Sequence, residues 1–268
     1  MTPDATRTFA ALAREALGDA LRRRLVLAIA VASLLSLQVV DSCTSCGSAT
    51  FTHDGETVAM PDVAGFSALA VAIACGLWTL ILAGALASDH LADPLQDGSA
   101  ALVLARPVGR GSFALARLAG ALAIALVSGA VLLFGAGVLL HARQGLAWPP
   151  LLAAFAACAA GASTVGALTM AASLFLPRIA TLLLLLMSVA GIAAANVAAL
   201  LGAQLGGFAA VIDGYGPPLV SSIALALREW IAPTAMPGDA LALGLRHAVW
   251  MLASAALLIH TFRRVDLE

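Results

Sequence analysis

The sequence predicts an all-α, polytopic membrane protein with six transmembrane helices, and three observations support this fold class. Of the 268 residues, 62% are hydrophobic and only 11% are charged, whereas a soluble domain carries about 25% charged residues. Apolar stretches of about 20 residues, long enough to cross a bilayer, recur along the chain. They are continuous runs of Leu, Ala and Val without the period-two alternation of a transmembrane β-strand. These observations exclude a soluble enzyme, a disordered chain and a secreted disulfide scaffold, and they argue against a β-barrel.

The whole chain, residues 1–268, is therefore interpreted as one transmembrane domain. The six candidate spans are residues 25–40, 66–88, 118–140, 150–176, 179–201 and 241–262. The first is the shortest, and the three arginines at residues 22–24 can reach the headgroups and lengthen it. The segment before it is long and contains Asp4, Glu15 and Asp19. It therefore does not fit a cleaved signal peptide.

The arginines predict the orientation of these spans. All 14 basic residues are Arg. With the N-terminus inside, only Arg143, Arg228 and Arg246 lie outside, and all the other arginines fall on the cytoplasmic side. We therefore expect a multi-pass protein of the bacterial plasma membrane with both termini cytoplasmic and an even number of spans. The net charge of -1 and the lack of a basic stripe predict no nucleic-acid partner.

The N-terminal segment, residues 1–24, predicts an amphipathic helix in the membrane interface. Phe9, Leu12 and Leu17 recur at helical spacing, and Arg7 and Arg14 lie away from that stripe. The alternative is a simple extension of the first span.

The first outer loop, residues 41–65, contains Cys43 and Cys46, followed by His53. In an oxidising compartment the two cysteines can form a local disulfide. Reduced thiols are the next interpretation, and a metal site or a thiol-redox site follows, because His53 is the only nearby imidazole. Cys75 and Cys158 fall inside spans and are expected to be small packing residues.

The cytoplasmic loop, residues 89–117, predicts a short helix. Asp93 can cap it, Pro94 suits its first position, and Gln96 can reach back to the cap. We expect this helix to pass through Leu102 and to end before Pro107. Its apolar face then needs the membrane interface or a soluble partner to cover it.

The outer segment, residues 202–239, is too apolar for an ordinary loop and too interrupted by Gly and Pro for a single span. It predicts short re-entrant or interfacial helices, one of them near residues 220–230; a mobile apolar loop is the alternative. Asn196, the one amide at mid-depth, is expected to hydrogen-bond between helices. Arg246 and His247 are expected to anchor the last span at the interface, or else to meet anionic headgroups or a lipid-like substrate.

The residues needed for catalysis or ion coupling are missing from the sequence. No Asp, Glu or Arg falls in the middle of the first five spans, where ion-coupled carriers place ionisable groups. The sequence contains no nucleophile–base motif and no P-loop. We therefore expect no catalytic residue, no metal and no cofactor, and any energy must come from another subunit.

The cytoplasmic loop resembles the corresponding stretch of the membrane subunits, or permeases, of type-2 ABC exporters. Four pieces carry the resemblance: Asp97-Gly98-Ser99, Leu102-Val103-Leu104, Arg106-Pro107-Val108-Gly109-Arg110 and Arg117-Leu118-Ala119-Gly120. Arg117 replaces the usual Lys, and the acidic residue directly precedes the glycine. The tail Phe262-Arg263-Arg264-Val265-Asp266-Leu267 is also similar. Within the family, the chain most resembles compact permeases of nitrous-oxide reductase maturation.

The resemblance implies a half-transporter that moves an unidentified substrate across the membrane. Two permease subunits, expected to be identical, would pair with two copies of a separate ABC ATPase subunit, surrounded by membrane lipids. The residues expected to couple ATP hydrolysis to the membrane are Asp93, Pro94, Asp97, Gly98, Leu102, Leu104, Arg106, Pro107 and Arg110. Two alternatives stay open: a membrane thiol oxidoreductase that uses Cys43 and Cys46, and a non-transporting scaffold.

Overall fold

The computed structural model describes residues 3–21, 51–53, 56–58, 63–105, 108–145, 147–204, 206–228 and 240–265, with a few single positions between 31 and 42. It confirms a helical chain. The helices are α1 (Pro3–Leu21), α3 (Val63–Gln96), α4 (Ser99–Leu104), α5 (Arg110–Gln144), α6 (Pro149–Ala172), α7 (Arg178–Leu200), α8 (Gly207–Tyr215), α9 (Leu219–Ala226) and α10 (Ala240–Arg264). Two short strands, β1 (Phe51–His53) and β2 (Glu56–Val58), pair antiparallel.

Five described helices are long and apolar enough to cross a membrane, as expected of a multi-pass membrane protein. They are Ser67–Gln96, Arg110–Ala142, Pro149–Ala172, Arg178–Leu200 and Ala240–Arg264. The predicted span at residues 25–40 falls almost entirely outside the described residues. α3 and α5 extend well beyond the spans predicted for them, because polar residues end an apolar stretch without ending the helix.

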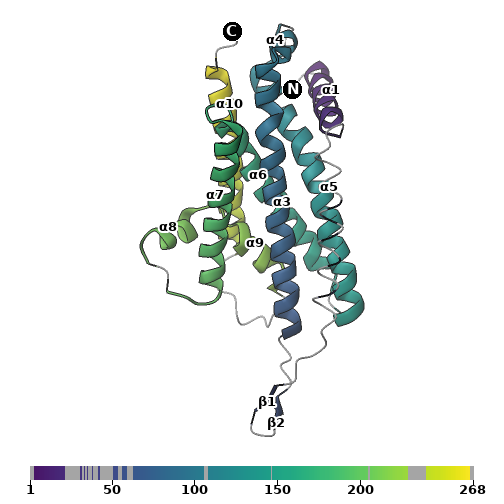
Figure 1. The fold of residues 1–268 in the computed structure, drawn as a ribbon, viewed down its shortest axis with the longest axis vertical. Coiled ribbons are helices and arrows are strands. Elements are labelled where there is room, and N and C mark those ends of the chain that lie inside the picture. The colour runs from purple at the N-terminus through teal and green to yellow at the C-terminus, as the bar shows by residue number, and fades with distance from the viewer. Residues whose placement is uncertain are drawn as a thin grey trace.

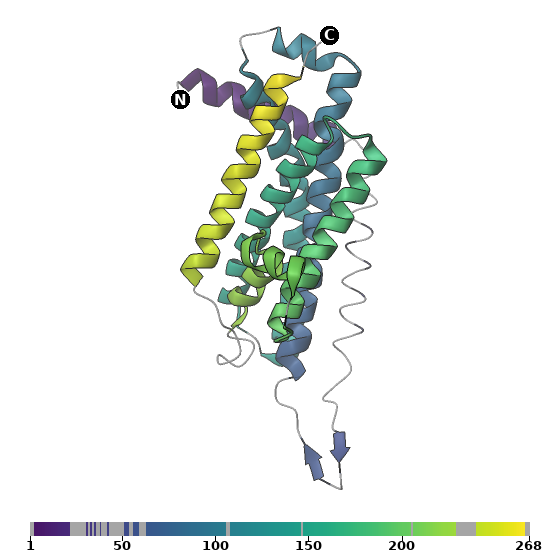
Figure 2. The same ribbon diagram turned by 90° about the vertical axis from the view of Figure 1, so that its left-hand side faces the viewer.

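The five long helices run side by side in an elongated bundle (Figure 1). The start of α1, all of α4 and the end of α10 lie at one end, which we call the α4 end. The β1–β2 hairpin marks the opposite end, the hairpin end. Figure 2 shows that α1 lies across the α4 end, at a steep angle to the long helices.

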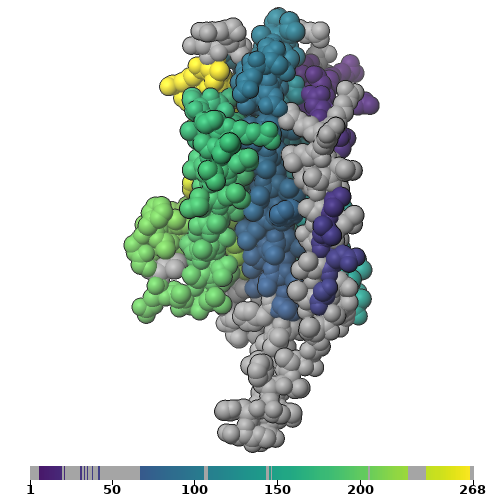
Figure 3. All heavy atoms as spheres, in the orientation of Figure 1, coloured from purple at the N-terminus to yellow at the C-terminus, as the bar shows by residue number. Residues whose placement is uncertain are grey.

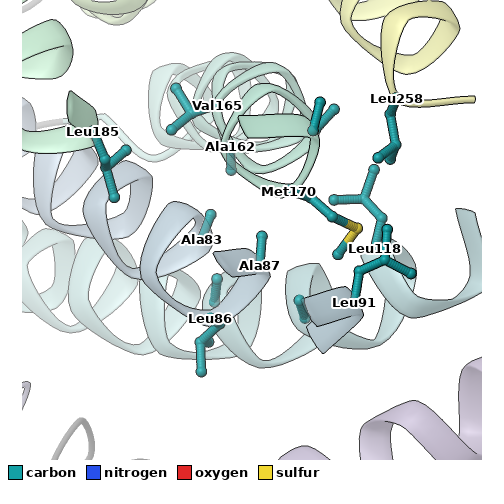
Figure 4. Close-up of a cluster of buried hydrophobic side chains, with 14 of the residues drawn as sticks. Ala83, Leu86, Ala87, Leu91, Leu118, Ala162, Val165, Met170, Leu185 and Leu258 are labelled. Atoms are coloured by element: carbon teal, nitrogen blue, oxygen red, sulfur yellow. The ribbon is translucent and has the colours of Figure 1, made fainter. Parts of the chain in front are cut away.

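α6 occupies a central position because its small residues let other helices approach closely. It packs against α3, α5, α9 and α10. A β-carbon on Gly161 would come within 3.0 Å of Leu80 Cδ2 in α3. In the core, Met170 of α6 lies among Leu91, Leu118 and Leu258, which come from α3, α5 and α10 (Figure 4). The small residues of α6 therefore let α3 approach it closely.

α8 and α9 form a bent pair in the outer segment, where the sequence predicts short helices. The two are bent by 56° at a short break. α7 runs from the α4 end to the hairpin end, and α10 runs back, while α8 and α9 both lie in the half of the bundle towards the hairpin (Figure 1). The chain therefore enters and leaves the bent pair in the same half of the bundle.

Candidate functional site

The predicted start of the cytoplasmic helix at Asp93 is wrong. α3 continues through Pro94 and ends at Gln96. The Asp97 N–H donates to the Asp93 carbonyl oxygen at 3.0 Å, so Asp93 lies inside a helical turn and is not the first residue of a new helix. Pro94 is tolerated because it costs only one backbone bond in the last turn of a long helix.

α4 begins after a sharp turn at Asp97 and Gly98. Gly98 has a φ of 75°, a left-handed conformation that favours glycine. The Ser99 N–H donates to Asp97 Oδ1 at 2.8 Å, and hydrogen bonds from the Ser99 hydroxyl and N–H lower the pKa of Asp97 below its ordinary value. These two residues therefore set where α3 stops and α4 starts.

The two leucines that were predicted to contact an ATPase face different ways. Leu102 is 77% exposed, whereas Ala100 is buried against the bundle. Leu104 and Val103 pack against the main hydrophobic core. Figure 3 shows α4 at the tip of the α4 end, uncovered by the other described helices in that view. α4 therefore keeps one side in the core and presents Leu102 outwards.

Arg110 is engaged within the chain itself, whereas the sequence analysis placed it among the coupling residues. Its Nη1 donates to the carbonyl oxygens of Arg263 at 3.1 Å and Val265 at 3.0 Å. It therefore connects the start of α5 to the end of α10. Arg106 and Pro107, also predicted for coupling, lie outside the described residues.

Two ion pairs that the sequence analysis did not find connect further helices at the α4 end. Arg117 of α5 pairs with Asp19 of α1 at 2.9 Å. Arg178 of α7 pairs with Asp89 of α3 at 2.8 Å, and the Asp89 side chain is only 6% exposed. The available signal was the position of these charges at the borders of apolar spans. With the Arg110 bonds, they link α4's neighbours α3 and α5 to α1, α7 and α10.

In the half towards the hairpin, polar side chains hold the bent α8–α9 pair. Asn196 of α7 donates to Asp213 at 2.9 Å and accepts the Val220 N–H at 3.2 Å, which confirms its predicted bonding between helices. Arg246 of α10 donates to the carbonyl oxygens of Asp213 and Gly214. Arg246 therefore binds the backbone of α8, a role that the sequence analysis did not foresee.

The cysteines divide between described and undescribed parts of the chain. Cys43 and Cys46 lie outside the described residues, so their disulfide stays a prediction. Cys75 and Cys158 are buried with free thiols, as expected of packing residues. Within the described ranges, no group of three or more His, Cys, Asp or Glu residues is arranged to hold a metal ion.

No protein-family model and no curated protein sequence matches this chain.

Proposed function

We propose that this chain is the permease subunit of a type-2 ABC exporter, driven by a separate ATPase subunit that docks on α4. One observation carries the proposal: a short helix between two long apolar helices presents an exposed leucine, Leu102, at the tip of the bundle. Ala101 and Ala105 beside it are also exposed, so this segment presents an apolar face outwards, which a partner can cover.

The ion pair and hydrogen bonds of the helices next to α4 support a mechanical role for α4. A displacement of α4 acts on α3 and α5 together, because α4 lies directly between them in the chain. The Asp89–Arg178 pair extends the displacement to α7, and the Arg110 bonds extend it to the end of α10. An ATPase that pushes on α4 would therefore move several helices as a unit.

The proposed topology has six spans, with the α4 end in the cytoplasm. The first crossing would lie between α1, at the α4 end, and the start of α3 at the hairpin end (Figure 1). Ser33 supports it, because its hydroxyl lies 2.9 Å from that of Ser128, about half-way along α5. The bent α8–α9 pair would be a re-entrant element and not a span, because α7 and α10 run in opposite directions.

The orientation follows from the positive-inside rule. The described arginines at the α4 end are Arg7, Arg14, Arg110, Arg117, Arg178, Arg263 and Arg264, whereas Arg143, Arg228 and Arg246 belong to the half towards the hairpin. The first group is the larger, so both termini would be cytoplasmic. Substantial parts of the α7 and α10 surfaces are exposed, and lipid and a second copy of the chain would cover them.

The proposal is tested with Leu102→Asp. Burying one leucine contributes about 1.5–3 kcal/mol, so the variant should bind its ATPase at least about tenfold more weakly and lose transport-stimulated ATP hydrolysis. The experiment uses an ATPase whose gene neighbours the gene of this chain. Co-purification and ATP hydrolysis are measured for variants that elute as monodisperse protein.

Leu176→Asp is the matched control. Leu176 is also exposed, and it lies in the α6–α7 turn, at the same end of the bundle but outside α4. It should leave binding and hydrolysis unchanged. Undiminished ATPase binding by Leu102→Asp, or an equal loss with Leu176→Asp, would contradict docking on α4.

A further inference from the structure

A cavity of about 640 Å³ lies between α6, α9 and α10. α6 lines it from Pro149 to Ala160, and α10 lines it from Ala240 to Met251. Each of these strips covers about three helical turns, or about 16 Å of helix. Since both strips start at the first turn of their helices, the cavity runs from the helix ends about half-way into the bundle.

The walls of the cavity are small and apolar, apart from three polar side chains. Arg228, Ser222 and His247 line it, and its described lining includes no carboxylate. The Ser222 hydroxyl is satisfied, because it donates to the Pro218 carbonyl oxygen at 2.6 Å. Arg228 therefore places a positive charge at the cavity, and none of the described lining residues carries a negative charge.

His247 lines the cavity, and its Nε2 atom is buried. The residue is only 6% exposed, and its Nε2 has no hydrogen-bond partner in the part of the chain that the structure describes. That atom lies 3.7 Å from where a β-carbon on Gly161 would be. That atom is itself fully buried, so a molecule in the cavity packs against His247 without reaching Nε2.

The cavity opens on the side of the bundle. Gly244, Ala248 and Met251 of α10 and Ala153 of α6 line it and are also exposed. Its mouth is therefore the surface between α6 and α10, which faces lipid if these helices span the membrane. A molecule in the bilayer could enter the cavity from the side and reach Arg228, which is itself exposed.

We propose that this cavity binds a single-chain amphiphile with a carboxylate head group. The head lies at Arg228, which supplies the positive charge and hydrogen-bond donors. The chain leaves across Gly244 and Ala248 into the membrane. The cavity has the size and the mainly apolar lining of a ligand site. This binding does not depend on an ATPase, so it can fail or succeed separately from the proposed function.

The test uses the full chain in phosphatidylcholine nanodiscs and a photoreactive fatty acid that carries a diazirine on its chain. Cross-links mapped by mass spectrometry should concentrate at residues 149–160 and 240–251. An excess of dodecanoate should remove them, whereas methyl dodecanoate, which lacks the charge, should not. Label spread equally over α5 and α7, or equal competition by the ester, would overturn the proposal.

Substitutions with matched controls separate a loss of fatty-acid binding from a loss of folding. Arg228→Gln should lower labelling at least tenfold, whereas Arg264→Gln, at the other end of α10, should not change it. Gly244→Leu narrows the mouth at an exposed position and should also lower labelling, while Ala190→Leu on the exposed face of α7 should not. Unchanged labelling of well-folded Arg228→Gln overturns the proposed head-group site.

Discussion

The two halves of the bundle differ in which backbone groups their polar side chains bind. At the α4 end, side chains form ion pairs between regular helices, as in Asp19–Arg117 and Asp89–Arg178, and Arg110 binds only carbonyl oxygens at the end of α10. In the half towards the hairpin, Asn196 and Arg246 bind the backbone of the broken α8–α9 pair. Regular helices satisfy their own backbone, whereas a broken helix within a membrane needs side chains to do so. Substitutions should therefore cost more in the second region.

The largest effect is expected for Asn196→Leu. The change removes the amide that bonds to Asp213 and leaves the N–H of the buried Val220 without an acceptor. We expect a loss of about 2–4 kcal/mol in the free energy of unfolding, measured by thermal unfolding in detergent. Ser163→Ala is the control, because that hydroxyl bonds only within its own helix. Equal stability of the two variants would show that Asn196 does not hold the bent pair.

A smaller effect is expected at the α4 end for Arg178→Gln. The change takes a cation away from the buried carboxylate of Asp89. Because Arg178 itself is 65% exposed, water screens much of the interaction, and we expect a loss of about 1–2 kcal/mol in the free energy of unfolding. Asp89→Asn should cost less, because it removes the buried charge together with the pair. If thermal unfolding showed Asp89→Asn to be less stable than Arg178→Gln, the unpaired charge of Asp89 would not be the main cost of losing this ion pair.

The sequence predicts the long helices well and the contacts between them poorly. The predicted span 179–201 differs by one residue at each end from α7, because the helix begins immediately after Pro177 and its apolar run is uninterrupted. The predicted cap at Asp93 fails because a helix that is already formed can absorb a proline in its last turn. The β1–β2 hairpin was not predicted, although Asp54-Gly55 is a dipeptide typical of tight hairpins.

In the candidate site, too, part of the local structure could be predicted from the sequence and the contacts between helices could not. The short helix through Leu102 follows from local sequence. The turn at Asp97 and Gly98 that begins it does not, because the predicted helix ran through both residues. The partners of Arg110 and Arg178 could not be predicted from local sequence. Arg110 binds α10, near the C-terminal end of the chain, and Arg178 binds α3. Such pairs depend on which helices are neighbours, and hydropathy does not determine this.

The smallest effect is expected for Asp97, whose hydrogen bonds to Ser99 fix the turn into α4. Because these bonds lower its pKa below the ordinary value of 3.8, folding favours the charged form. The contribution is therefore complete above pH 3.8 and is lost as the pH falls through the lower pKa of the folded state. A nitroxide on Leu102→Cys, in a variant whose four native cysteines are replaced by Ala, should report constant α4 mobility from neutral pH to about pH 5 and rising mobility below about pH 4. With Asp97→Asn added, mobility should not change over that range, whereas a rise of the same size in both proteins would show that another group controls the turn.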